Sequence, residues 1–298
     1  MDPLVSAAVE KLHIDDRPRP LTPRHTTSWR TAHWKIKTVE SAADSAPLLH
    51  EVRALALLRD AGLTCVATDQ GRVGEGTWTA IGWQEGATLW DWCRPGREGP
   101  TGCEGLPGVS SRTAVHAGAR LTSKHAHRAF DRLDRLHAAG WRHGDLHPGN
   151  IVVTDLGDIE FIDHDLTHHR ELLPLPYPYR GGVDHATAPE TARQLLDTAP
   201  DIGIEPTAAA ETYSLGASIR WAWTGVTPST SRASGPDVDP TDILKDIATG
   251  RHRVPLTDSR PWPDPDLEAL LDNAMSLNPA TRTRAFPTDP SPPPNRNH

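Results

Sequence analysis

The chain has 298 residues and a formal net charge of -8, so it is long enough for one two-lobed unit and lacks the basic balance that is typical of a nucleic-acid binder. Its three cysteines are an odd number without metal-finger spacing, which suits a reducing compartment and a fold without disulfides. The acidic start lacks the apolar core of a signal peptide, and no apolar run is long enough for a bilayer, so we expect a cytoplasmic protein that binds no membrane.

The first part of the chain predicts a short extension followed by a small sheet with one helix. Residues 1–25 combine an amphipathic helix with a Pro/Arg-rich connector and are interpreted as an N-terminal extension. Within residues 26–92, β-forming residues alternate over Thr26–Val39, which predicts a hairpin. A helical spacing of apolar residues then ends at Gly62, and two strands around a Gly-rich turn and a short helix, ATLWDWC, follow.

The later part of the chain is predicted to be mainly helical. Residues 93–111 are rich in Gly, Pro and Ser, which indicates a loop insertion. Residues 112–285 start with one long helical pattern that ends at Gly140, and they carry two more such patterns, ETYSLGASIRWAWTG and DLEALLDNAMSL. Residues 286–298 are Pro-rich and predict a disordered tail. We therefore expect an α+β fold with a small β-rich N-lobe and a mainly helical C-lobe.

The stretch HGDLHPGN, which begins at His143, lies between the long helix and a predicted hairpin, IVV to IEFIDHD. This order would bring Asp145, Asn150 and Asp163 together at the mouth of the hairpin. Phosphoryl transfer needs a carboxylate that positions the attacking hydroxyl and oxygen ligands that hold Mg²⁺. We expect Asp145 to take the first role and Asn150 with Asp163 to take the second, because Mg²⁺ prefers oxygen ligands.

These residues resemble the protein-kinase superfamily, whose catalytic loop reads H-R-D-x-x-x-x-N and whose metal-binding Asp heads D-F-G. The form HGDLHPGN, with Gly144 in place of the Arg, looks like the aminoglycoside-phosphotransferase and bacterial kinase-like branch. An Asp and an Asn five residues apart occur often by chance. The resemblance gains its weight from the motifs that follow in order.

Those later motifs resemble the C-lobe of serine/threonine kinases. The chain carries an A-P-E that ends at Glu190, and a Y-S-L-G helix in which Glu211 replaces the usual Asp. The stretch NPATRTRAF is similar to the family's D-P-x-x-R-x-x, which would pair Arg282 with Glu190. The resemblance covers about residues 26–285 and implies a two-lobed protein-kinase-like fold with ATP and Mg²⁺ between the lobes.

The resemblance also implies a strand lysine on the α- and β-phosphates of ATP, held by a helix glutamate. Lys35 and Lys37 lie two apart on the predicted strand and point to the same face. We favour Lys37 with Glu51 as its partner, because WKIKTV resembles the apolar-Lys-Thr run of aminoglycoside kinases. Lys35 is the rival, and an exposed strand lysine is the alternative for either. The stretch GWQEG resembles the hinge, where backbone groups near Gly82 and Gln84 would bind adenine.

Three departures from the family pattern bear on the mechanism. No G-x-G-x-x-G precedes the lysine strand, where HTTSW stands instead, so a cover of backbone N–H groups over the phosphates is not assured. The D-F-G has become Asp163-His164-Asp165, which keeps the metal ligand and loses the Phe that sets active and inactive states. Gly144 removes the Arg that would bind a phosphate on the activation loop, so we expect no switching by phosphorylation there.

The histidines that crowd this region suggest a zinc enzyme as a rival interpretation. Against it, Pro148 and Gly149 break the helix that would place two rings on one face. We expect His143 to brace the loop by hydrogen bonding. His147 stands where many protein kinases carry a γ-phosphate lysine, and we assign it to the catalytic group, with an exposed loop histidine as the alternative.

The predicted function is an ATP-dependent kinase that transfers the γ-phosphoryl group to a hydroxyl. A Ser or Thr of a protein or peptide is the leading acceptor, because the A-P-E and the helix after it form the peptide-docking half in protein kinases. A more specific version is a kinase for a precursor peptide in lanthipeptide-type biosynthesis, with a partner enzyme of that pathway. The alternatives are a small-molecule, aminoglycoside-type phosphotransferase and a pseudokinase that serves as a scaffold or binding module; the intact Asp145, Asn150 and Asp163 argue against the pseudokinase.

Overall fold

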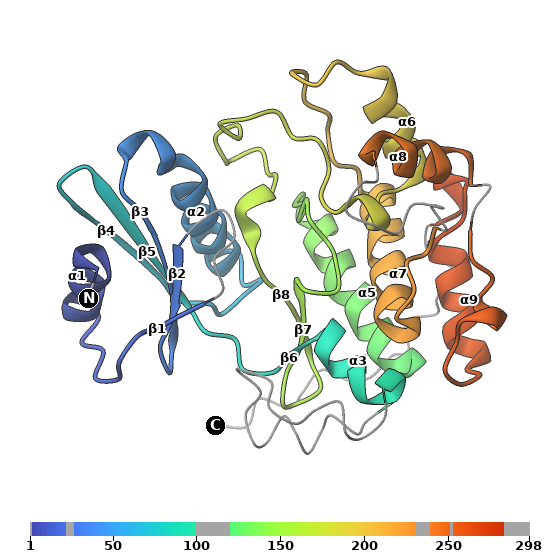
Figure 1. The fold of residues 1–298 in the computed structure, drawn as a ribbon, viewed down its shortest axis with the longest axis horizontal. Coiled ribbons are helices and arrows are strands. Elements are labelled where there is room, and N and C mark those ends of the chain that lie inside the picture. The colour runs from blue at the N-terminus through green and yellow to red at the C-terminus, as the bar shows by residue number, and fades with distance from the viewer. Residues whose placement is uncertain (1, 22–26, 99–119, 230–238, 251–252, 283–298) are drawn as a thin grey trace.

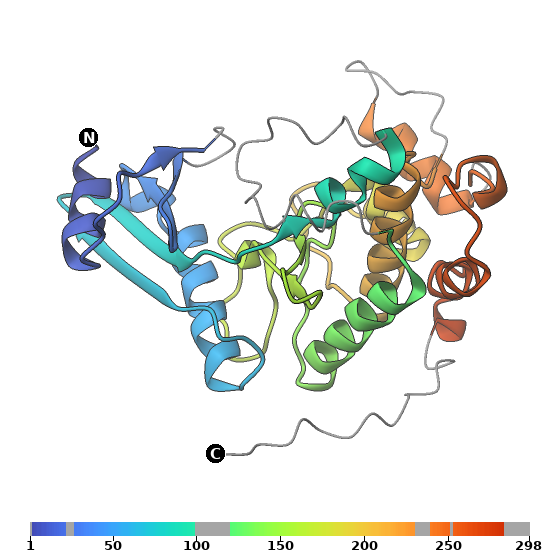
Figure 2. The same ribbon diagram turned by 90° about the horizontal axis from the view of Figure 1, so that it is seen from below.

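The protein has two lobes that differ in secondary structure (Figure 1). The computed structural model describes residues 2–21, 27–98, 120–229, 239–250 and 253–282. A five-stranded sheet lies in the N-terminal part and the later part is mainly helical, so the fold is α+β, two-lobed and protein-kinase-like, as the sequence predicts. Seen from below, the blue sheet and the orange and red helices again lie at opposite ends of the molecule (Figure 2).

The sheet of the N-lobe has the strand order β1-β2-β3-β5-β4, and all neighbouring strands are antiparallel. The alternating stretch forms the predicted hairpin, β2 and β3, and the Gly-rich turn joins β4 to β5. β1 is an addition to the predicted elements, since it lies in the Pro/Arg-rich connector and pairs with β2. Residues 22–26 between these two strands, which include the start of HTTSW, lie outside the described residues. The strands are β1 (Arg19–Pro20), β2 (Thr27–Arg30), β3 (Trp34–Val39), β4 (Thr68–Val73) and β5 (Gly76–Gly82).

Two helices cover opposite faces of this sheet. Successive side chains of a strand point to opposite faces, so Ile36 and Lys37 of β3 face different helices. Helix α2 (Ala46–Asp60) lies on the side of Lys37, and α1 (Pro3–Lys11) lies on the side of Ile36. The stretch predicted as an N-terminal extension therefore includes a helix that shares a core with the sheet. This core comprises Leu4, Val5, Ala8, Ile36, Trp78 and Ala80.

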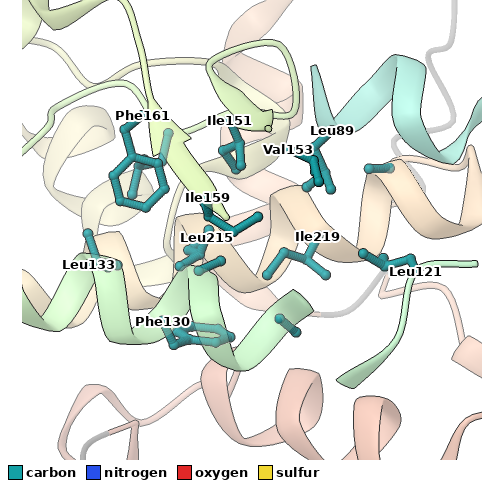
Figure 3. Close-up of a cluster of buried hydrophobic side chains, with 14 of the residues drawn as sticks. Leu89, Leu121, Phe130, Leu133, Ile151, Val153, Ile159, Phe161, Leu215 and Ile219 are labelled. Carbon is teal, nitrogen blue, oxygen red and sulfur yellow. The ribbon is translucent and has the colours of Figure 1, made fainter. Parts of the chain in front are cut away.

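The C-lobe starts with a small antiparallel sheet that contains the second predicted hairpin. Its apolar side chains pack on helices α5 and α7 and form the largest hydrophobic core. Figure 3 shows side chains of this hairpin converging with Phe130 and Leu133 of α5 and with Leu215 of α7. Helix α7 is buried on most of its faces, so it gives the loops that lie on it a fixed base. The strands are β6 (Ala87–Thr88), β7 (Ile151–Val153) and β8 (Ile159–Phe161), and the two helices are α5 (Ser123–Ala138) and α7 (Ala208–Thr224).

Helix α3 (Leu89–Glu98) is longer than the short helix that the sequence predicts. The predicted loop insertion starts at residue 93, yet the chain is helical to Glu98 with Pro95 inside the helix. Proline costs the helix one backbone hydrogen bond. The side chains of Leu89, Trp92 and Cys93 are buried in the main core, so their packing outweighs the Gly/Pro-rich composition. Residues 99–111 of the predicted insertion lie outside the described residues.

Helix α5 is shorter than the long helical pattern that predicts it. It begins at Ser123, because Thr122 and His125 form a capping box that satisfies the first free N–H groups. It ends where predicted, with Gly140 at a φ of 87° directly after the helix. Residues 112–119, where the pattern starts, lie outside the described residues.

Two further helices of the C-lobe match the predicted patterns and two are additional. α7 and α9 (Pro265–Ala274) correspond to ETYSLGASIRWAWTG and DLEALLDNAMSL. α6 (Pro189–Asp197) and α8 (Pro240–Thr249) were not among the predicted elements, although each carries proline in its first turn, which is an N-terminal helix signal. The predicted tail, residues 286–298, lies outside the described residues.

If α1 is part of the N-lobe core, truncating its buried face should destabilise the protein. Val5 is fully buried, whereas Val9 on the same helix is only partly buried. We expect Val5→Ala to lower the free energy of unfolding by about 2 kcal/mol, because it removes two buried methyl groups and leaves a cavity. Val9→Ala is the matched control and should cost less than half as much. Equally small losses for both variants in urea denaturation would show that α1 does not pack on the sheet in solution.

Candidate active site

Three charged side chains from separate elements meet where the two lobes join. Lys37 comes from β3, Glu51 from α2 and Asp163 from the loop that follows β8. Lys37 Nζ lies 2.7 Å from Glu51 Oε2 and also 2.7 Å from Asp163 Oδ1. The side chains of Lys37 and Glu51 are only 8% and 2% exposed, so this ion pair is shielded from water.

The charges of this cluster stabilise one another. Burial opposes the charge on Lys37, but the carboxylates of Glu51 and Asp163 outweigh it and raise the pKa of the lysine. Burial also opposes the charge on Asp163, but Lys37 and Lys35 lower the pKa of this carboxyl well below its usual range. Lys37 and Asp163 are therefore both ionised at neutral pH.

The structure distinguishes the two candidate lysines by their partners. Lys37 is bonded to Glu51, the glutamate predicted as the partner of the phosphate-binding lysine. Lys35 lies on the same face, but its Nζ is 3.6 Å from Asp163 Oδ1 and its side chain is 26% exposed. Lys35 lines the cleft between the lobes. The Lys37 ammonium group is thus held by two short ion pairs, whereas the Lys35 side chain is more exposed and makes one longer contact.

The predicted catalytic loop lies between α5 and β7 and holds its polar side chains close together. Asn150 Nδ2 donates a hydrogen bond to Asp145 Oδ2 at 3.1 Å and another to the Asp145 carbonyl at 3.0 Å. His147 Nε2 lies 3.7 Å from Asp145 Oδ2. The N–H of Gly149 donates to His147 Nδ1, so in the neutral ring the proton belongs on Nε2, the nitrogen nearer Asp145.

The surroundings of Asp145 shift the pKa of its carboxyl group. Burial raises the pKa of Asp145; His147 lowers it, and the negative charge of Asp163 raises it further. A carboxylate with a raised pKa is a better proton acceptor, which is a common property of catalytic bases. The neighbourhood of Asp163 and His147 therefore tunes the carboxylate that is predicted to orient the attacking hydroxyl.

Gly144, which stands where the family has Arg, is required by the local backbone conformation. Gly144 has a φ of 85°, which L side chains rarely adopt. A Cβ atom at this position would also overlap the carbonyl oxygen of Leu166. The loop can therefore approach the segment after Asp163 this closely only with glycine at position 144.

Two buried histidines support the loops of the site. His143 Nε2 lies 3.1 Å from the carbonyl oxygen of Ile162, and His143 Nδ1 accepts the N–H of Asp145. His143 thus links the loop of Asp145 to the loop of Asp163, which is the bracing role predicted for it. Burial lowers the pKa of His143 well below its usual value, so the ring stays neutral and can accept this bond.

His164 occupies the position of the family's Phe and is likewise held by hydrogen bonds. Its Nε2 lies 3.1 Å from the carbonyl of Phe161, and its Nδ1 lies 3.0 Å from Thr167 Oγ1. Burial lowers the pKa of His164 to about 4, so a neutral imidazole replaces the phenyl ring. These bonds fix His164 inside the protein, whereas a phenyl ring would be held by packing alone.

The donor set at Asn150 and Asp163 fits a magnesium ion. Asn150 uses Nδ2 for both of its side-chain bonds, so among the described residues no donor is bonded to its amide oxygen. Asp163 presents a carboxylate from a left-handed backbone with a φ of 66°, an uncommon conformation that is found often at functional sites. Mg²⁺ binds through one or two protein oxygens and keeps waters or nucleotide phosphates as its other ligands. The two predicted metal ligands therefore offer the oxygens that such an ion needs.

A cleft beside this cluster has the mainly apolar lining that is typical of a site for a nucleotide base. Lys35, Glu51 and Asp163 border it on the side of the charged cluster. Gly82 and Gln84, the residues predicted to bind adenine, both line it. The N–H of Gly82 is bonded to Ala67, while its carbonyl accepts the side-chain amide of Gln84 at 3.2 Å. The other lining residues include Leu55, Val66, Ile81, Val152, Phe161 and Ile162.

Three residues whose contacts no motif predicts hold the predicted catalytic loop against the C-lobe. Glu211 of α7 accepts the N–H of Gly144 at 2.6 Å and lies 2.7 Å from His137 Nε2. Tyr179 donates its hydroxyl to the carbonyl of Gly144 at 2.7 Å. The Y-S-L-G motif includes Glu211 but does not predict its bond to Gly144. The sequence carries no signal for His137 or Tyr179, which come from distant parts of the chain.

The ion pair predicted to tie the A-P-E motif to the C-lobe is present. Arg282 bonds Glu190 through both guanidinium nitrogens, at 2.5 and 2.8 Å, in the bidentate geometry that makes such pairs strong. The Arg282 side chain is fully buried, and its Nε also donates to the carbonyl of Ser276. This pair anchors the start of α6, which directly follows the segment near Asp145.

Comparisons with known proteins agree with this architecture. No protein-family model matches the chain. A stretch of 152 residues, 50% of this chain, is 31% identical to the serine/threonine-protein kinase PknK of Mycobacterium tuberculosis, and 30% identical to PknK of Mycobacterium bovis. The match spans only 12% of the length of these relatives. Within the part of the chain that the structure describes, no helix is both long and apolar enough to pass through a membrane. Half of the chain is thus distantly similar to a serine/threonine-protein kinase, which supports phosphotransfer of the kinase type.

Proposed function

We propose that this protein is an ATP-dependent kinase that transfers the γ-phosphoryl group of ATP to a hydroxyl. The observation that carries the proposal is the buried cluster of Lys37, Glu51 and Asp163, which lies next to the bonded pair Asp145 and Asn150. A lysine fixed by two carboxylates, a metal-binding carboxylate and a base are the parts that phosphoryl transfer needs. The distant similarity to PknK supports the same reaction type.

Each residue has a distinct task in this mechanism. Lys37, held in place by Glu51, provides a fixed positive charge for the phosphates of ATP. Asp145 orients the acceptor hydroxyl and takes its proton, and Asn150 fixes the Asp145 carboxylate. Bound Mg²⁺, held by Asn150 and Asp163, would neutralise charge on the phosphates. We place His147 beside the base as a further donor toward the transferred group, because its Nε2 is close to Asp145.

We further propose that the acceptor is a Ser or Thr of a protein or peptide. The ordered A-P-E motif and its ion pair, Glu190 with Arg282, support a surface for an extended chain near Asp145. The relatives are serine/threonine-protein kinases by name. A precursor peptide of a lanthipeptide-type pathway, with a partner enzyme that acts on the product, is the most specific version of this proposal. Its test is phosphorylation of a precursor peptide encoded beside this protein, compared with casein.

One observation favours the alternative of a pseudokinase. The connection between β1 and β2, residues 21–26, contains no glycine, so the backbone N–H groups that usually cover ATP phosphates are not assured. Titration of Mg-ATP into the wild-type protein by calorimetry separates the two functions. Heat of binding supports the kinase, and no binding at millimolar Mg-ATP would leave the pseudokinase. A small-molecule kinase is the second alternative. Comparing transfer to a peptide with transfer to a small-molecule hydroxyl distinguishes it from a protein kinase.

The metal and base assignments predict different effects for two isosteric variants. Asp163→Asn and Asp145→Asn should each reduce phosphoryl transfer by about 10²–10³-fold, because each removes preorganised charge. Mg-ATP affinity should fall mainly for Asp163→Asn, since only this residue is assigned to the metal. Transfer rates and calorimetric affinities of the two variants check this. Full turnover in both variants would contradict the mechanism.

The lysine assignment predicts a ranking. Lys37→Ala should weaken the use of Mg-ATP far more than Lys35→Ala, because only Lys37 is fixed by Glu51. Lys37→Ala should also destabilise the fold, since it leaves the Glu51 carboxylate buried without its partner. Steady-state kinetics over a range of ATP concentrations, with the unfolding midpoint as a control, give the comparison. A larger kinetic defect in Lys35→Ala than in Lys37→Ala would show that Lys35 binds the phosphates.

The acceptor proposal predicts a selective defect at the C-lobe ion pair. Arg282→Lys keeps the charge and loses the bidentate geometry that holds Glu190. We expect this variant to impair transfer to a peptide more than background ATP hydrolysis, because the metal cluster is untouched. The ratio of the two rates in wild type and variant is the measurement. An equal loss of both rates, or no loss, would point to a small-molecule acceptor.

A further inference from the structure

The segment that follows the metal-binding loop has an unusual composition. Between Thr167 and Thr187 the sequence contains no serine or threonine, and its hydroxyl groups are those of Tyr177 and Tyr179. Tyr177 is exposed, whereas Tyr179 points into the protein and is bonded there. Three prolines at alternate positions, 174, 176 and 178, restrict the backbone. Phosphorylation of serine or threonine therefore has no acceptor within this segment.

Tyr179 bonds this segment directly to the catalytic loop. Its hydroxyl donates to the carbonyl of Gly144, the residue before Asp145, at 2.7 Å. Its own carbonyl accepts the N–H of Ile204, and its ring packs edge-on against His168 with the ring centres 4.7 Å apart. Burial raises the pKa of Tyr179, so the hydroxyl keeps the proton that it donates.

The backbone of Gly144 is consequently held at both its N–H and its carbonyl. Glu211 of α7 accepts its N–H, and Tyr179 binds the carbonyl of the same residue. Asp145 follows directly, so the direction of its side chain depends on how this glycine is oriented. Glu211 ties the loop to the core of the C-lobe, whereas Tyr179 ties it to the segment that an acceptor would contact.

Arg180 fixes the same segment to the end of α6. Its guanidinium group donates four hydrogen bonds to backbone carbonyls, at 2.9 to 3.2 Å. These carbonyls lie in the last turn of α6 and the chain after it, where a helix has free acceptors and favours a positive charge. The acceptors are Leu195, Thr198, Ala199 and Ile202.

The fixed segment lies against the catalytic carboxylate. A Cβ atom at Gly182 would overlap Asp145 Oδ1, so the backbone there is in close contact with the base. Asp145 Oδ1 is buried, and the backbone N–H of Val183 in this segment helps to lower the pKa of the Asp145 carboxyl. Oδ2 is the oxygen that Asn150 binds. The segment therefore determines which side of the carboxylate an acceptor hydroxyl can reach.

We propose that Tyr179 and Arg180 form an anchor that holds residues 177–183 on the catalytic loop without phosphorylation, and that Tyr179 is a positioning residue for Asp145. The inference rests on the proposed kinase function and adds its mode of regulation. In this arrangement the hydroxyl of Tyr179 replaces an ionic contact between a phosphate and an arginine. The kinase is then active as synthesised, and its control lies outside this segment.

Tyr179→Phe tests the anchor because it removes one hydroxyl and keeps the ring. Tyr177→Phe is the matched control, since it removes an exposed hydroxyl two residues away. We expect Tyr179→Phe to speed amide hydrogen exchange in residues 172–188, and to lower kcat for transfer to casein about five- to tenfold with an unchanged KM for ATP, the effect of losing one hydrogen bond. Tyr177→Phe should match the wild type in both measurements. Equal exchange and equal kcat in Tyr179→Phe and wild type would overturn the proposal.

Phosphatase treatment provides the second test. Wild-type protein treated with a nonspecific phosphatase should keep its transfer rate and its exchange protection in residues 172–188. A loss of either after treatment would show that phosphorylation holds the segment and would overturn the anchor. The exchange comparison needs no turnover, so it decides the anchor even if the wild type transfers nothing to casein, a result that would count against the proposed function alone.

Discussion

One ammonium group, Nζ of Lys37, joins the two lobes by charge. It is buried, and a buried charge is tolerated only where opposite charges compensate it. Its two partners come from α2 and from the loop after β8, so the strand, the helix and the C-lobe loop must meet at one point. Removing one partner of such a cluster leaves an uncompensated charge that costs about 3–5 kcal/mol. The same contact that joins the lobes therefore fixes the positive charge that is proposed to bind the phosphates of ATP.

A buried carboxylate has the corresponding role inside the C-lobe. Glu211 uses one oxygen for the N–H of Gly144 and the other for His137, so both oxygens are satisfied and the side chain has one position. It lies on α7, the most thoroughly buried helix, and it fixes the loop above it from within the core. Asp145, the proposed base, is thus supported by the core through Glu211 and Gly144, while the lysine cluster is supported by charge balance. Neither support requires a bound ligand.

Local patterns predicted much of the fold and most of the polar cluster. The two hairpins and α2 follow from alternation and helical spacing, and the pairing of Arg282 with Glu190 follows from the family resemblance. The extension of α3 past Pro95 and the pairing of β1 could not be predicted, because both depend on packing or pairing with distant segments. The bond from Tyr179 to Gly144 could not be predicted either. The two residues are 35 positions apart, and no sequence motif contains both of them.

The two features that set this catalytic loop apart from the family pattern have one structural cause. Position 144 is compatible only with glycine, because its backbone is left-handed and the carbonyl of Leu166 occupies the space of a side chain. An arginine there would have to move the loop away from the segment that follows Asp163. With glycine, the loop comes close enough for Tyr179 to reach the Gly144 carbonyl. The loss of the arginine and the gain of the tyrosine bond are therefore linked, and in the proposed kinase the tyrosine bond takes the place of a contact that phosphorylation could switch.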